Sequence, residues 1–86
     1  MKNLYNKKFY ESNRKTTLLG SKIILQIIFE KLKKQPVNIM DIGCGTGEWL
    51  NSASELGIKD LNGLDGTWVD NDSLINKKIK LKKIDL

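Results

Sequence analysis

The stretch "MDIGCGTGEWL", Met40 to Leu50, places three glycines at alternate positions directly behind a run of apolar residues. Glycine costs about 0.5–1 kcal/mol relative to alanine inside a regular helix or strand, so three glycines so close together need a structural reason. Either the chain turns sharply here, or a ligand comes very close to the main chain. A tight turn without a ligand is the simpler alternative.

The residues on either side of the glycines predict a strand before them and a helix after them. Residues 37–42, "VNIMDI", carry apolar side chains on both faces, which is typical of a parallel strand covered on both sides by helices. From Trp49 to Leu56 apolar residues recur on one helical face, and Gly57 is suited to end that helix. A glycine-rich turn of this kind presents N–H groups at the carboxyl edge of a sheet, where ligands of open α/β folds bind. We therefore expect a ligand-binding turn.

The remaining segments complete an α/β pattern. Residues 16–34 predict a helix with an apolar face that must pack against another part of the protein. The residues of this face are Leu19, Ile23, Ile27 and Leu32, with Ile24 and Ile28 beside them. Residues 60–65 and 78–83 predict two further strands. The connection between them, residues 66–78, is about the minimum length for a parallel crossover, and we expect one or two helical turns in it. We expect residues 1–15 to form a polar N-terminal arm that is either mobile or a short helix, and residues 16–86 to form the α/β portion.

The composition excludes several classes of site. Cys44 is the only cysteine and there is no histidine, so no internal disulfide, Ser–His or Cys–His pair, or zinc cluster is expected, and we predict no metal site. The net charge of +5 comes mostly from lysine without arginine clusters or aromatic ladders, which favours solvated faces over nucleic-acid binding. The longest apolar stretch is far shorter than the roughly 20 residues of a membrane span, and we expect a cytoplasmic protein.

The spacing Asp41-Ile-Gly43-Cys-Gly45-Thr-Gly47 distinguishes between two nucleotide-binding patterns. The dinucleotide fingerprint requires glycine at position 48, where this chain has Glu48, a carboxylate close to where a pyrophosphate would lie. A nucleotide-dependent oxidoreductase is therefore disfavoured. The spacing resembles the first motif of the class I, Rossmann-like S-adenosylmethionine-dependent methyltransferases, and "LDGTWVD" from Leu64 looks like a variant of their type-11-like bacterial members. Their cofactor is cationic and carries no phosphate.

The resemblance implies a set of residues that contact S-adenosylmethionine. Asp65, after the second strand, would accept both ribose hydroxyls, unless it is only a turn residue before Gly66. Trp68 either stacks on the adenine or covers the sheet edge, and Asp85 either lies near the adenine amino group or simply ends the third strand. Tyr5, Phe9 and Tyr10 either form a lid or pack on the first helix. The full set is Asp41, Gly43, Cys44, Gly45, Gly47, Asp65, Gly66, Trp68 and Asp85.

The resemblance covers about residues 18–86 and implies a partial Rossmann-like methyltransferase fold, with three parallel strands in the order 3-2-1 and flanking helices. The fourth strand and the acceptor pocket would follow Leu86, so no catalytic residue and no methyl acceptor is assigned. We expect the cofactor-binding part of a methyltransferase, in which residues 37–42 present an unpaired edge that favours self-association or pairing with a C-terminal half. The alternative is an inactive remnant that acts as an interaction module through this edge.

Overall fold

The computed structural model describes residues 7–85, with side chains from residue 13 onward. Two α-helices, three strands and one short 3-10 turn follow one another along this range. Their bounds are α1 Lys7–Lys31, β1 Asn38–Ile42, α2 Glu48–Glu55, β2 Asp60–Gly66, η2 Asn71–Ser73 and β3 Lys80–Ile84. No helix in this range is long and apolar enough to cross a membrane.

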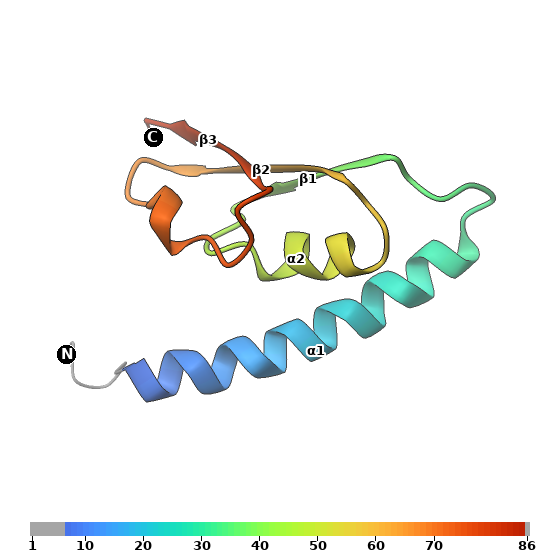
Figure 1. Ribbon diagram of the computed structural model, residues 1–86, viewed down its shortest axis with the longest axis horizontal. Coiled ribbons are helices and arrows are strands. Elements are labelled where there is room, and N and C mark those ends of the chain that lie inside the picture. The colour runs from blue at the N-terminus through green and yellow to red at the C-terminus, as the bar shows by residue number, and fades with distance from the viewer. Residues whose placement is uncertain (1–6, 86) are drawn as a thin grey trace.

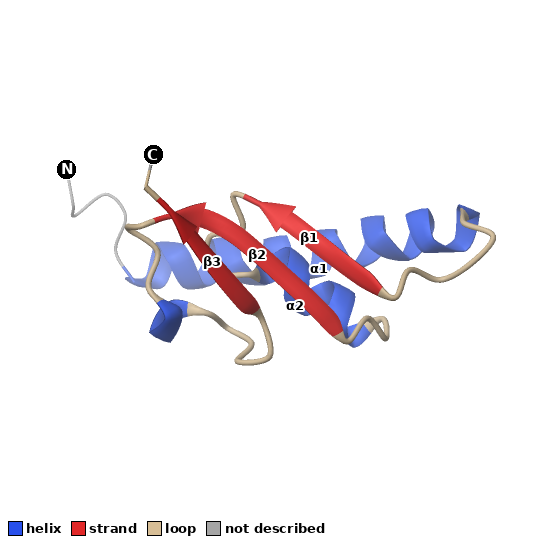
Figure 2. Ribbon diagram, turned by 90° about the horizontal axis from the view of Figure 1, so that it is seen from above, coloured by secondary structure: helices blue, strands red, loops and turns tan. Residues whose placement is uncertain are grey.

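The three strands form one parallel sheet in the order β1-β2-β3, so the predicted α/β class with three parallel strands in this order is confirmed. The register pairs Asp41 of β1 with Gly63 of β2, and Gly63 with Leu81 of β3. All three carboxyl ends therefore meet at one edge of the sheet (Figure 2). The helical turn predicted in the connection between the second and third strands is η2, and the Asp70 carboxylate accepts a hydrogen bond from the Asp72 N–H at 3.0 Å.

Both helices lie on the same side of the sheet, which corrects the expectation of a strand covered on both faces. Figure 1 shows three layers, with the sheet above α2 and α2 above α1. Leu50 and Ala53 of α2 and Leu61 of β2 are completely buried between the first two layers. On the opposite face of the sheet, Met40 and Ile42 are 62% and 75% exposed.

Helix α1 begins at Lys7 rather than at Thr16, so one continuous helix runs through the second half of the predicted arm. The face that it buries also differs from the predicted one. Ser21 and Leu25 are buried against α2, whereas the predicted apolar positions are 46–65% exposed, namely Leu19, Ile23, Ile24, Ile27, Ile28 and Leu32. The two helices cross where Ser21 meets Ser52, with 2.6 Å between their hydroxyl oxygens. Two small side chains at the crossing let the helices approach closely, and this fixes the rotation of α1.

Candidate functional site

The glycine turn between β1 and α2 adopts a backbone that only glycine takes up readily. Gly43, Gly45 and Gly47 have φ angles of 79°, 56° and 91°, all in the left-handed region. The turn is joined to β2, because the Gly43 N–H donates to the Leu64 carbonyl at 2.6 Å. Backbone geometry therefore explains these glycines first, because the strand can lead into the helix this abruptly only through residues with left-handed φ angles.

The three glycines differ in what surrounds them. A Cβ on Gly43 or Gly45 would have no other atom within 4 Å, so the main chain there faces open space. A Cβ on Gly47 would lie 2.5 Å from Ile79 Cδ1, and Gly47 is buried. The structure therefore places Gly43 and Gly45 where a ligand can reach the main chain, while Gly47 serves packing and the start of α2.

Asp65 connects the end of β2 to the open turn. Its Oδ2 accepts a hydrogen bond from the Gly45 N–H at 2.8 Å, and its Oδ1 accepts one from the Gly66 N–H at 2.7 Å. The carboxylate thus points at the glycine turn and also forms the local turn before Gly66, so its role as a turn residue is confirmed and its binding of a ribose stays a prediction. Each carboxylate oxygen has capacity for a second hydrogen bond.

A second carboxylate lies close to Asp65. Burial, and then the charge of Asp65, raise the pKa of Asp41 above its usual value. Burial, followed by the charges of Asp65 and Asp41, likewise raises the pKa of the Cys44 thiol. The turn is therefore an electrostatically negative place in which a cationic group would relieve the repulsion between the two carboxylates.

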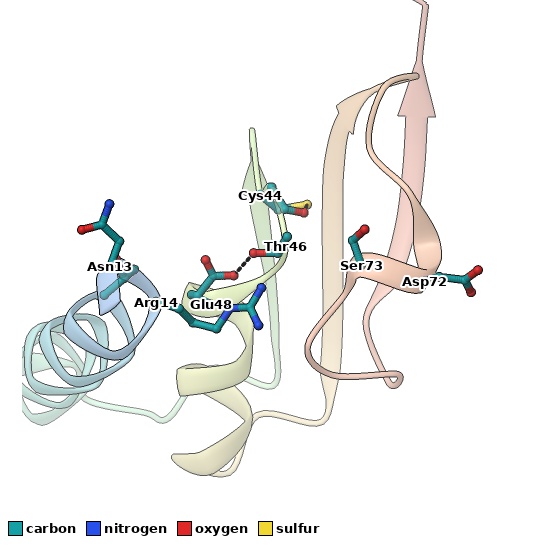
Figure 3. A pocket seen from close by; sticks show the side chains of 9 residues that line it. Asn13, Arg14, Cys44, Thr46, Glu48, Asp72 and Ser73 are labelled. Carbon is teal, nitrogen blue, oxygen red and sulfur yellow. Dashed lines mark hydrogen bonds between the residues drawn. The ribbon is translucent and has the colours of Figure 1, made fainter. Parts of the chain in front are cut away.

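Two hollows adjoin the turn. The smaller, of about 160 Å³, lies at the carboxyl edge of the sheet and is lined by Ile42, Gly43, Leu64, Asp65 and Ile84. The larger, of about 690 Å³, lies between the turn, α1 and η2 (Figure 3). Cys44 and Gly45 line the larger one. Gly43 thus borders the smaller hollow and Gly45 the larger one.

The other predicted residues are placed less centrally. The indole of Trp68 packs on Gly66, in the space that a Cβ would take, and is 71% exposed. Trp68 thus covers the end of β2. Asp85 is exposed just beyond β3, at the carboxyl edge, and lines neither hollow. The side chains of Tyr5, Phe9 and Tyr10 lie outside the described residues.

Sequence reasoning missed the contribution of α1 to the site. Asn13, Arg14 and Thr17 line the larger hollow together with residues of the turn. Their spacing places them on one face of a helix. The sequence contains no signal that this face lies beside the turn, because that depends on how α1 crosses α2.

Comparisons of the chain with protein-family models, curated proteins and solved structures returned no match.

Proposed function

We propose that this chain is the S-adenosylmethionine-binding part of a Rossmann-like, cytoplasmic methyltransferase. The observation that carries the proposal is the Asp65 carboxylate, which is hydrogen-bonded to the Gly45 N–H beside main chain that faces open space. The remaining capacity of both carboxylate oxygens suits the two hydroxyls of a ribose. The strand order and the resemblance of the turn sequence to methyltransferases support the same assignment.

The charges at the turn favour this cofactor over a dinucleotide. Asp41 and Asp65 interact unfavourably with each other, and Glu48 lies at the start of α2, where a pyrophosphate would otherwise bind. A ligand with an ammonium and a sulfonium is attracted by these groups, whereas a phosphate is repelled. The cofactor, when bound, supplies an electrophilic methyl group.

The residues of this chain would hold the cofactor rather than react with it. Methyl transfer depends chiefly on keeping donor and acceptor in line, so a rigid cradle is itself a contribution to the rate. Gly43 and Gly45 would admit the nucleoside to the main chain, and Asp65 would fix the ribose. Trp68, which lies on Gly66, would border the adenine.

Calorimetry with S-adenosylhomocysteine and NADH tests the assignment. We expect the first to bind and the second not to bind. Asp65→Ala should abolish the binding of S-adenosylhomocysteine, whereas Asp85→Ala, at the same sheet edge but outside both hollows, should retain most of it. Binding of NADH alone, or equal binding of S-adenosylhomocysteine by the Asp65→Ala variant, would contradict the proposal.

The uncovered side of the sheet favours a second candidate, an interaction module. In the described part of the chain β1 pairs only with β2, so its other edge is open, and Val37, Met40 and Ile42 are 62–80% exposed. In this reading the chain binds no cofactor and pairs along β1 with a second strand. Sedimentation over a range of concentrations would then show association that Ile42→Lys removes, together with no binding of S-adenosylhomocysteine.

A further inference from the structure

The outer face of α1 carries a row of apolar side chains that the rest of the described chain leaves about half exposed. Ile23, for example, lies on the opposite face of the helix from Ser21, which is buried against α2. Because α1 forms an outer layer of the molecule (Figure 1), a flat surface can reach this row without any rearrangement. Contiguous exposed apolar patches usually mark an interaction site. The isoleucine row consists of Leu19, Ile23, Ile24, Ile27, Ile28 and Leu32.

The charges beside the isoleucine row are mostly positive. Lys15 lies four residues before Leu19, and Lys31 lies four residues after Ile27, so helical spacing places a lysine at each end of the row. Both lysines are exposed, and neither takes part in an ion pair within the described part of the chain. Glu30 is the one acidic residue among the described side chains of α1. The row therefore has a basic border.

Further lysines strengthen this border at the end of α1. Lys33 and Lys34 follow Leu32 directly and are exposed. Lys22, on the side of the helix, contributes less, because its ammonium lies 3.6 Å from the Glu55 carboxylate of α2. The positive charge is thus concentrated where α1 ends.

We propose that α1 lies along an anionic membrane surface, with the isoleucine row at the boundary between headgroups and acyl chains and with Lys15 and Lys31 on the lipid phosphates. Lysine-rich amphipathic helices bind such surfaces through burial of the apolar face and attraction to anionic lipids. A lysine side chain suits this boundary, because its stem covers apolar surface while its ammonium stays in the polar layer. The helix binds the surface without crossing the bilayer, and no helix of the described chain is long and apolar enough to cross one.

The basic border favours a lipid surface over a second copy of the chain. A twofold symmetric dimer places the same patch of both subunits against each other, so the lysines of one copy would approach those of the other. An anionic bilayer instead attracts each lysine, with a gain of about fivefold in the binding constant per residue. This inference is independent of the proposed function, because no residue of the isoleucine row lines either hollow at the glycine turn.

Co-sedimentation with vesicles tests the contribution of the apolar side chains. We expect binding to vesicles of phosphatidylcholine and phosphatidylglycerol, and weak binding to phosphatidylcholine alone. The double variant Ile23→Asn and Ile27→Asn should bind the mixed vesicles about tenfold to a hundredfold more weakly, because two apolar side chains no longer enter the bilayer. The matched control is Met40→Thr with Ile42→Thr, which removes exposed apolar surface from the open face of the sheet and should retain the binding.

A second pair of variants tests the charges. Lys15→Gln with Lys31→Gln should weaken binding to the mixed vesicles by about tenfold to thirtyfold, and added salt should weaken the binding of the parent protein. Lys59→Gln with Lys78→Gln makes the same change in net charge at two exposed lysines that precede β2 and β3. This control should bind nearly as well as the parent protein. The lysine variants also serve as the test if the asparagine variant does not fold.

Several results would overturn the membrane assignment. These are no binding of the parent protein to the mixed vesicles, equal losses in a variant and its control, or equal binding to vesicles without anionic lipid. Self-association that the Ile23 and Ile27 variant removes, without vesicle binding, would assign the isoleucine row to a second copy. Asp65→Ala should bind vesicles like the parent protein. A protein that binds vesicles but not S-adenosylhomocysteine would contradict the proposed function alone.

Discussion

The Cys44 thiol occupies the space that a side chain on Gly63 would need, since a Cβ on Gly63 would lie 2.6 Å from Cys44 Sγ. Gly63 is in the middle of β2, beside Asp41 of β1, and its own backbone does not require glycine. The glycine is therefore explained by packing. Its missing side chain lets the turn residue Cys44 fold back over the sheet and brings the turn close to Asp65.

We predict that Gly63→Ala destabilises the protein through this contact. Overpacking of a core site costs about 1–3 kcal/mol, and the new methyl group would also meet Leu50 at 3.4 Å. Cys44→Ala removes the sulfur, so the double variant should recover part of the loss. Urea denaturation of the four proteins in a double-mutant cycle measures the coupling. Additive effects would show that the two residues do not interact in this way.

Gly45→Ala should separate ligand binding from folding. Its φ of 56° is one that alanine adopts at a cost of roughly 1–2 kcal/mol, and the new methyl group would meet no atom of the protein. It would instead occupy the open space next to the main chain of the turn. We therefore expect loss of S-adenosylhomocysteine binding in a protein that still folds.

Gly57→Ala provides the matched control for this prediction. Gly57 also has a left-handed φ, of 105°, but it ends α2 far from the turn in the chain and lines neither hollow at the site. Thermal melts should show destabilisation in both variants, while calorimetry should show lost binding only in Gly45→Ala. A similar loss of affinity in both would mean that general destabilisation is the cause.

Asp41→Asn should raise the stability of the protein and weaken its binding of a cationic ligand. Burial and Asp65 raise the pKa of Asp41 from its ordinary 3.8, so the native state binds more protons than the unfolded chain in the interval above that value. Stability therefore falls as the pH rises through this interval, and the full penalty is present at neutral pH. Asparagine carries no charge and should remove that penalty.

Melting curves over a pH series test the predicted direction of this pH dependence. At pH 7 the Asp41→Asn variant should melt at a temperature higher by on the order of a few °C, and well below pH 3.8 the difference should vanish. Binding of a cationic ligand should weaken at neutral pH, because one of the two carboxylates is gone. A variant that is less stable than the parent protein at pH 7 would contradict the electrostatic account.

The buried hydrogen bond between Ser21 and Ser52 should contribute to the docking of α1. Both side chains are almost completely buried, and each hydroxyl lies 3.2 Å from the Leu18 carbonyl oxygen. Replacing either serine by alanine should cost about 0.5–1.5 kcal/mol, and the double variant should cost less than the sum of the two. Ser54→Ala, on the less buried side of α2, should change the urea midpoint little. Equal effects at Ser52 and Ser54 would show that α2 loses helix stability in general.

The elements of the fold were predictable because they depend on local signals. Glycines at 43, 45 and 47 mark the end of β1, Gly57 marks the end of α2, and a connection of about the minimum length for a parallel crossover links β2 to β3. The start of α1 was misplaced because the polar residues before Thr16 carry no apolar period, although the helix continues through them. Helical propensity and the helix that follows are enough to keep this segment helical.

The sequence by itself determined the α/β class, the glycine turn and the acidic residue at position 65, because backbone angles and strand periodicity are properties of neighbouring residues. Only the tertiary structure decided that both helices share one face of the sheet, that Ser21 rather than the isoleucine row faces α2, and that Arg14 reaches the turn. These arrangements depend on how closely α1 and α2 approach. That distance is set by small side chains thirty-one positions apart in the chain.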